Sequence, residues 1–120
     1  MSNSVFHLVV SGARHLSNAS LVATHLSSAL SKQPGLVLVC GNGKGCDTLV
    51  RQWASTHKVP LLVAPAHWAS YGKAAGPIRN RFMLSMAQGV LAFPQAGSKG
   101  TAHVIRTAKE LGLPLRVVAC

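Results

Sequence analysis

Residues 37–47, which read VLVCGNGKGCD, decide the fold of this chain. An apolar run ends at Cys40, and a glycine then occupies every second position, at Gly41, Gly43 and Gly45. Glycine lets the backbone turn sharply and approach a ligand closely. The first N–H groups of a helix have no partner inside the helix, so they favour an anion. The stretch therefore predicts a strand, a phosphate-binding loop and a helix.

Outside this stretch, apolar runs alternate with segments of helical periodicity. We expect strands over residues 5–10, 36–40, 61–64, 90–94 and 113–119, and helices that begin at Ser17 or Asn18, at Gly45 or Cys46, at Pro77 and after Thr101. Near-continuous apolar strands between amphipathic helices are typical of a parallel sheet that is covered on both faces. We therefore expect an open three-layer α/β domain with a mainly parallel sheet of about five strands.

Length and composition favour a single domain over residues 1–120. The chain has 120 residues, of which 48% are hydrophobic, and it contains no apolar run long enough to span a membrane. Its three cysteines give an odd count without paired spacing, which favours reduced thiols over a secreted disulfide framework. We expect a cytoplasmic protein without a membrane partner.

Two finer expectations concern the second half of the chain. Residues 66–76 are expected to form one long loop, followed by a helix whose inner face carries Ile78, Phe82 and Met86. In the last helix, the expected core positions are Val104, Ile105, Ala108 and Leu111.

Three loops rich in small residues follow strands of the expected sheet, at residues 11–14, 41–45 and 97–101. Ligands of parallel sheets bind beyond the carboxyl ends of the strands, so these loops should converge on one site. The net charge is +10, with twelve Lys and Arg against two acids. Half of the cations lie in or just after the edge loops: Arg14, Lys44, Lys73, Arg79, Arg81 and Lys99. A single cation near a loop is often only solvated, but the set favours a phosphate-bearing ligand.

Asp47 is the only carboxylate that the pattern brings to this edge, because Glu110 lies about 15 Å along the last helix. Three roles are open for Asp47, in this order: stabilising the helix start, binding ribose hydroxyls, and acting as a base for a water. Hydrolysis by paired carboxylates is not supported. Asp47 is thus the only catalytic candidate.

The aromatic residues Trp68 and Tyr71 lie outside any periodic apolar face, so they either stack on a base or pack their loop onto the core. The glycine loop has neither GxGxxG nor Walker spacing, and we expect no dinucleotide or ATP cofactor. The six histidines and Cys40 with Cys46 lack zinc-ligand spacing, so no metal site is expected.

Residues 66–84, AHWASYGKAAGPIRNRFML, resemble the YspA-like (cpYpsA-related) family of the SLOG superfamily, which also holds the LOG proteins and DprA. Residues 11–14, 43–47 and 93–101 resemble further motifs of that family, so the likeness spans the chain. It implies a Rossmann-like domain that binds nucleotides or nucleotide-derived ligands. The ligand-facing roles that it implies fall on Gly12, Arg14, Gly43, Gly45, Asp47, Arg79, Asn80, Gly97, Gly100 and Thr101.

The chain departs from the family pattern at three places. Cys46 replaces an alanine, which is a small change, and the double glycine before Thr101 is loosened to QAGSK at residues 95–99. More consequentially, Val104 stands where the LOG enzymes carry a glutamate. We therefore expect a nucleotide-binding module, sensor or scavenger rather than an enzyme. A hydrolase of a nucleotide N-glycosidic or phosphate bond and a single-stranded nucleic-acid-binding protein are the alternatives. The resemblance also leaves a homodimer open.

Overall fold

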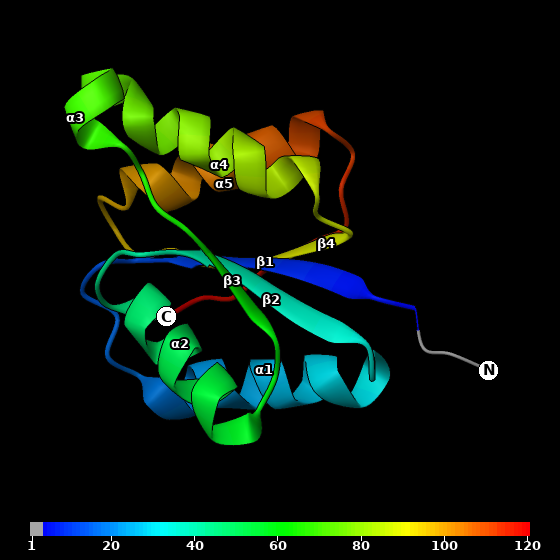
Figure 1. Ribbon diagram of the computed structural model, residues 1–120. Helices are drawn as coiled ribbons and strands as arrows, with labels where there is room; N and C mark the ends of the chain where they lie inside the picture. Colours follow the sequence, from blue (N-terminus) through cyan, green and yellow to red (C-terminus); the bar gives the residue numbers. More distant parts are fainter. Residues whose placement is uncertain (1–3) are drawn as a thin grey trace.

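The computed structural model describes residues 4–120, and it contains a five-stranded parallel sheet in the order β3-β2-β1-β4-β5 (Figure 1). The strands are β1 (Phe6–Gly12), β2 (Leu36–Gly41), β3 (Leu61–Ala64), β4 (Gly89–Phe93) and β5 (Leu115–Val117). The chain builds outward from β1 to β3 and then returns to the other side of β1 with β4. The strand order therefore reverses beside β1, which is where ligands of such sheets bind.

Helices cover both faces of the sheet (Figure 1). On one side lie α1 (Ala19–Lys32) and α2 (Cys46–His57), and on the other lie α4 (Ala75–Ser85) and α5 (Lys99–Glu110). The short α3 (Trp68–Tyr71) and the 3-10 helix η1 (Gly72–Ala74) lead into α4. The expected Rossmann-like α/β domain is confirmed. Within residues 4–120, no helix is long and apolar enough to cross a membrane.

Alternating residues of the strands feed two separate core clusters. On the α1 and α2 side, Val10 and Leu38 pack with Leu26 and Phe93, while Val9 and other residues form the cluster under α4 and α5. Successive side chains of a strand point to opposite faces, so one strand can serve both clusters. The near-continuous apolar strands of the sequence are explained by this double burial.

The loop after β1 and the start of α2 are packed backbone against backbone. A Cβ at Gly12 would lie 2.5 Å from the Cys46 sulfur, and Gly45 has a φ of +65° with the carbonyl groups of Ala13 and Arg14 against its Cα. The Cys46 N–H also donates to the Ala13 carbonyl at 3.1 Å. Glycine is required at Gly45 because an added side chain would meet both a strained φ and two carbonyls.

The long loop expected over residues 66–76 is mostly helical, so that prediction is wrong. The chain forms α3 and η1 there, and α4 begins at Ala75, which makes Pro77 its third residue rather than its first. Proline fits this position because the N–H groups of a first helical turn have no partner within the helix.

The predicted inner face of α4 is wrong for Ile78 and Phe82, whereas Met86 is half-buried and packs against the cluster under α4 and α5. Ile78 and Phe82 are 42% and 58% exposed, whereas Asn80 and Met83 are buried. The inward face of α4 carries Met83 and Leu84, which pack in the cluster under α4 and α5. Asn80 lies on the same face and donates to the Gly100 carbonyl of α5 at 3.4 Å.

In the last helix the predicted core positions are confirmed for Val104 and Ala108, which are buried, and Ile105 is half-buried. Leu111 is exposed instead, because α5 ends at Glu110 and Leu111 is its C-terminal cap.

The two glycines at helix starts make a matched pair for a stability test. We predict that Gly45→Ala lowers the free energy of unfolding by about 2 kcal/mol or more, because it combines a positive φ with contacts to carbonyl groups. Gly100→Ala should raise this free energy slightly or change it by less than about 1 kcal/mol, because a Cβ there meets no atom within 4 Å. Denaturant unfolding of both variants measures this, and similar losses would contradict the packing.

Candidate functional site

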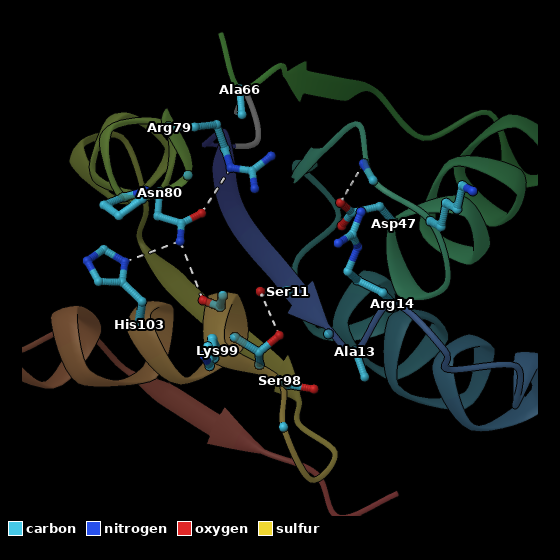
Figure 2. A pocket seen from close by; sticks show the side chains of 18 of the residues that line it. Ser11, Ala13, Arg14, Asp47, Ala66, Arg79, Asn80, Ser98, Lys99 and His103 are labelled. Atoms are coloured by element: carbon cyan, nitrogen blue, oxygen red, sulfur yellow. Dashed lines mark hydrogen bonds between the residues drawn. The ribbon is translucent and has the colours of Figure 1, made fainter. Parts of the chain in front are cut away.

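A cavity of about 730 Å³ opens at the carboxyl edge of the sheet, where the strand order reverses. It is lined by the loops after β1, β2 and β4, by residues before and within α4, and by one face of α5 (Figure 2). The three loops predicted to converge therefore do so.

Most of the residues expected to contact a ligand line this cavity. They are Gly12, Arg14, Gly43, Lys44, Asp47, Trp68, Lys73, Arg79, Asn80, Gly97, Lys99, Gly100 and Thr101. Gly41, Gly45 and Tyr71 do not. Gly41 lies beneath the Arg79 guanidinium, Gly45 packs against the loop after β1, and the Tyr71 ring is exposed on α3.

Twelve further residues line the cavity that were not among the expected ligand contacts, although Ser11, Ala13, Asn42 and Ser98 belong to the loops expected to converge there. The twelve are Ser11, Ala13, His15, Asn42, Ala66, Gly76, Pro77, Gln95, Ala96, Ser98, His103 and Arg106. The helical spacing from Lys99 would have revealed the charged ones, because residues four and seven positions further on, His103 and Arg106, lie on the same face of α5. Arg81, which was expected near the edge loops, is exposed on α4 and does not line the cavity.

The loop after β2 is held by two side chains of α2. Asp47 Oδ2 accepts a hydrogen bond from the Gly43 N–H at 3.0 Å. Arg51 Nη1 donates to the carbonyls of Gly41 and Gly43, at 3.3 and 3.2 Å, and Arg51 Nη2 donates to Thr48 Oγ1 at 3.2 Å. The carboxylate thus fixes an N–H group of the loop and the guanidinium fixes its carbonyls. The role of Arg51 was not predicted.

The Asp47 carboxyl lies at the cavity wall, where burial and the neighbouring groups act on its pKa in opposite directions. Burial raises the pKa of its carboxyl above the usual 3.8, while the Gly43 N–H and the guanidinium groups of Arg79 and Arg51 act to lower it. The carboxylate therefore belongs to the structure of the loop. It also brings negative charge to the start of α2.

The start of α5 differs from that of α2. Its N-terminal cap, Ser98, makes no side-chain bond to the helix, because Ser98 Oγ accepts from the Gln95 N–H at 3.2 Å instead. The first turn of α5 contains no acidic residue. The N–H groups of Gly100 and Thr101 belong to that turn, and both residues line the cavity. This helix start is the better of the two for an anion.

A hydrogen-bonded chain ties α4 to β3 and α5, and Figure 2 shows the part of it that runs from Arg79 through Asn80 to α5. Arg79 Nη1 donates to the Ala64 carbonyl at 3.3 Å, and Arg79 Nε donates to Asn80 Oδ1 at 2.9 Å. Asn80, which is 3% exposed, continues to the Gly100 carbonyl and to His103 Nδ1, at 3.4 and 3.2 Å. Arg79 is thereby fixed across the cavity floor.

The buried thiols offer no nucleophile. Desolvation by burial is the main cause that raises the pKa of Cys40 to about 12, and burial raises the pKa of Cys46 as well. Within residues 4–120, no group of three or more His, Cys, Asp or Glu side chains could hold a metal ion. The chemistry that this site supports is the recognition of anions.

Residues 6–71 match the family described as "YspA, cpYpsA-related SLOG family". The chain belongs to this family. It is 34% identical over 115 residues to the Gene 61 protein of Mycobacterium phage D29, an alignment that covers 90% of this chain and 92% of that protein.

The fold of this SLOG domain resembles that of DNA processing protein A (DprA) from Streptococcus pneumoniae, with a TM-score of 0.75 over 94% of this chain. At 19% sequence identity this likeness shows the fold alone, and the SLOG domain spans half of that chain, 50%. In the SLOG domain, Val104 is 1% exposed and packs in the core cluster under α4 and α5. The position expected to hold the glutamate of the LOG enzymes therefore faces the core.

The role of Arg51 can be tested by removing its donors while keeping its length. We predict that Arg51→Met lowers the free energy of unfolding by about 1–2 kcal/mol, because two loop carbonyls lose a partly buried charged donor. The control is Arg81→Met, an exposed arginine of α4, which should change it by less than about 0.5 kcal/mol. Faster amide exchange at Gly43 in the Arg51 variant alone would accompany the loss, and equal effects would refute the assignment.

Proposed function

We propose that this SLOG domain binds a nucleotide or a nucleotide-derived phosphorylated ligand in the cavity, as a sensor, scavenger or binding module. The charge of the cavity wall carries the proposal. Six of the twelve Lys and Arg residues line it, namely Arg14, Lys44, Lys73, Arg79, Lys99 and Arg106. Among the described residues that line it, Asp47 is the single carboxylate. A concave wall of one sign concentrates anions.

The first turns of α2 and α5 differ in charge, so they favour different parts of a nucleotide. A phosphate is favoured at the first turn of α5, where no acidic side chain competes and where Lys99 is the first residue of the helix. At the first turn of α2, the Asp47 carboxylate repels a phosphate and suits a ribose hydroxyl instead. We infer that the phosphate binds toward α5 and the sugar toward α2.

Trp68 is the side chain best suited to a nucleobase. It lines the cavity although it is 58% exposed, so one part of the ring is available at the mouth. A Cβ at Gly76 would lie 3.4 Å from the ring, which shows that the indole rests on the first turn of α4. Stacking on an aromatic ring tolerates any base, and the identity of the base is left to polar contacts.

Two alternatives are favoured less. A hydrolase would rely on Asp47 alone, and this carboxylate already accepts a hydrogen bond from Gly43. A single-stranded nucleic-acid-binding protein is compatible with the net charge of +10 and with the likeness to a solved DNA processing protein. However, the cations gather in a cavity rather than along an exposed groove.

The fluorescence of Trp68 can report ligand binding once Trp53, the other tryptophan of the chain, which is buried, is replaced. In a Trp53→Phe background, we predict that AMP, ADP or ADP-ribose quenches the Trp68 fluorescence in a saturable way. Arg79→Ala should weaken binding by about tenfold or more, since it removes a charged donor from the cavity. Lys32→Ala, an exposed cation at the end of α1, is the control and should bind like the parent.

The absence of quenching and of any thermal shift with mono- and diphosphates, cyclic nucleotides and ADP-ribose would refute the proposal. Equal weakening by both substitutions, with a steep dependence on salt for oligonucleotides, would support the nucleic-acid alternative instead.

Asp47→Asn separates binding from hydrolysis. We predict tighter binding of inorganic pyrophosphate, because a negative charge leaves the cavity, and weaker binding of ADP by about threefold to tenfold, because the ribose loses a charged acceptor. Isothermal titration measures both affinities. Neither variant nor parent should release base or phosphate from a nucleotide. Turnover by the parent that is lost in Asp47→Asn would establish the hydrolase.

A further inference from the structure

The hydrogen bonds that link Arg79 to His103 through Asn80 indicate which atoms donate and which accept. An arginine Nε–H can only donate, so the Asn80 oxygen must be the atom that faces Arg79 at 2.9 Å. The Asn80 NH₂ group then faces α5, where it donates to the Gly100 carbonyl and to His103 Nδ1. His103 Nδ1 must accept, so the imidazole is neutral and carries its proton on Nε2. His103 Nε2 lies 3.5 Å from Thr107 Oγ1, which can accept a hydrogen bond from this N–H.

The surroundings of His103 favour the same neutral form. Burial is the largest cause that lowers the pKa of His103 below 6.5, and the charges of Arg81 on α4 and Arg106 on α5 act in the same direction. Glu110 opposes them. Strands β1 and β5 also pack on α5. The titratable or charged residues that they carry are His7, near the amino end of β1, and Arg116 on β5.

We propose that neutral His103 is a positioning residue that holds Arg79 across the cavity through Asn80, and that protonation of His103 releases Arg79. An imidazolium has an N–H on both nitrogens, so it cannot accept from the Asn80 NH₂ group. If the Asn80 amide turns over to offer its oxygen to His103, its NH₂ group then meets the Arg79 Nε–H, and two donors face each other. Asn80 cannot satisfy both a protonated His103 and Arg79: the original orientation keeps the Gly100 and Arg79 bonds but sets the NH₂ group against the imidazolium, and the reversed orientation gives up both of those bonds.

Release of Arg79 from Asn80 would leave its guanidinium less ordered at the floor of the cavity. Arg79 Nη1 lies directly over Gly41 and donates to the Ala64 carbonyl, so the guanidinium bridges from α4 to the ends of β2 and β3. Without the Asn80 contact, the guanidinium keeps its bond to the Ala64 carbonyl and the attraction of the Asp47 carboxylate, and it loses the bond that fixes its Nε–H. The consequence for affinity rests on the proposed function, but the consequence for the order of Arg79 does not.

The first experiment needs no ligand. In a ¹⁵N spectrum of the whole chain at neutral pH, we expect the His103 ring in the Nε2–H tautomer and a resolved, slowly exchanging Arg79 Nε–H signal. As His103 titrates at some point below its ordinary value of 6.5, this signal should move and broaden with the same midpoint. An Nδ1–H tautomer, or an Arg79 signal that ignores the titration, would overturn the proposal.

A pair of substitutions tests the acceptor. His103→Asn keeps an acceptor oxygen near the position of Nδ1 but cannot be protonated, whereas His103→Leu removes the acceptor. We expect the Arg79 Nε–H signal to persist down to about pH 5 in His103→Asn and to be broadened at every pH in His103→Leu. A side chain that merely filled space would give the opposite ranking, because leucine is the better apolar replacement.

Affinity provides the second arm. ADP-ribose is a suitable probe because each phosphate of its pyrophosphate bridge carries an ester and an anhydride bond, and so lacks the second ionisation near pH 6 of a phosphate monoester. At about pH 7.5, where wild-type His103 is neutral, His103→Leu should bind it about threefold to tenfold more weakly than wild type, and His103→Asn within about twofold. Equal binding by all three chains, with Arg79 responding as expected, would overturn the link to the ligand. If ADP-ribose binds none of them, the proposed function fails and the spectra alone decide on His103.

Discussion

The close approach of two backbones at the start of α2 is the constraint on which the rest of this domain depends. Gly12 and Gly45 carry no side chains, so the loop after β1 packs directly on the loop that enters α2. The Cys46 N–H bonds across this contact to the Ala13 carbonyl. Two loops that follow neighbouring strands are thereby held as one wall, and the loop after β4 and the start of α5 face it across the point where the strand order reverses.

The two helix starts on this edge are not equivalent, and the difference gives the cavity a direction. The first turn of α2 brings a carboxylate with it and uses that group to hold Gly43. The first turn of α5 brings none. The glycine loop at residues 41–45, the stretch of sequence that most resembles a phosphate-binding loop, is therefore the less suitable place for a phosphate. Its residues act mainly as a scaffold, with Arg51 beneath the loop and Arg79 over Gly41.

The sequence predicts the strands, the convergence of three loops and about half of the residues of the cavity wall, because these follow from apolar runs and from glycines between them. It fails where tertiary contacts decide. The prediction for α4 was wrong at Ile78 and Phe82, which have helical spacing but are exposed, because the face with Met83 and Leu84 packs in the core instead. Arg51 was missed because its partners are backbone carbonyls, which have no signature in the sequence. His103 was missed because its role depends on the orientation of one amide.

The central claim is that a nucleotide binds in this cavity with its phosphate at the start of α5. Amide shift mapping of the ¹⁵N-labelled chain during titration with ADP tests it most directly. We predict the largest changes at Gly100 and Thr101, with smaller ones at Gly43 and Lys44 across the cavity, and saturation at a single site. Changes centred on exposed cations outside the cavity, such as Lys32, Lys58 and Arg116, or no saturation at all, would contradict the claim.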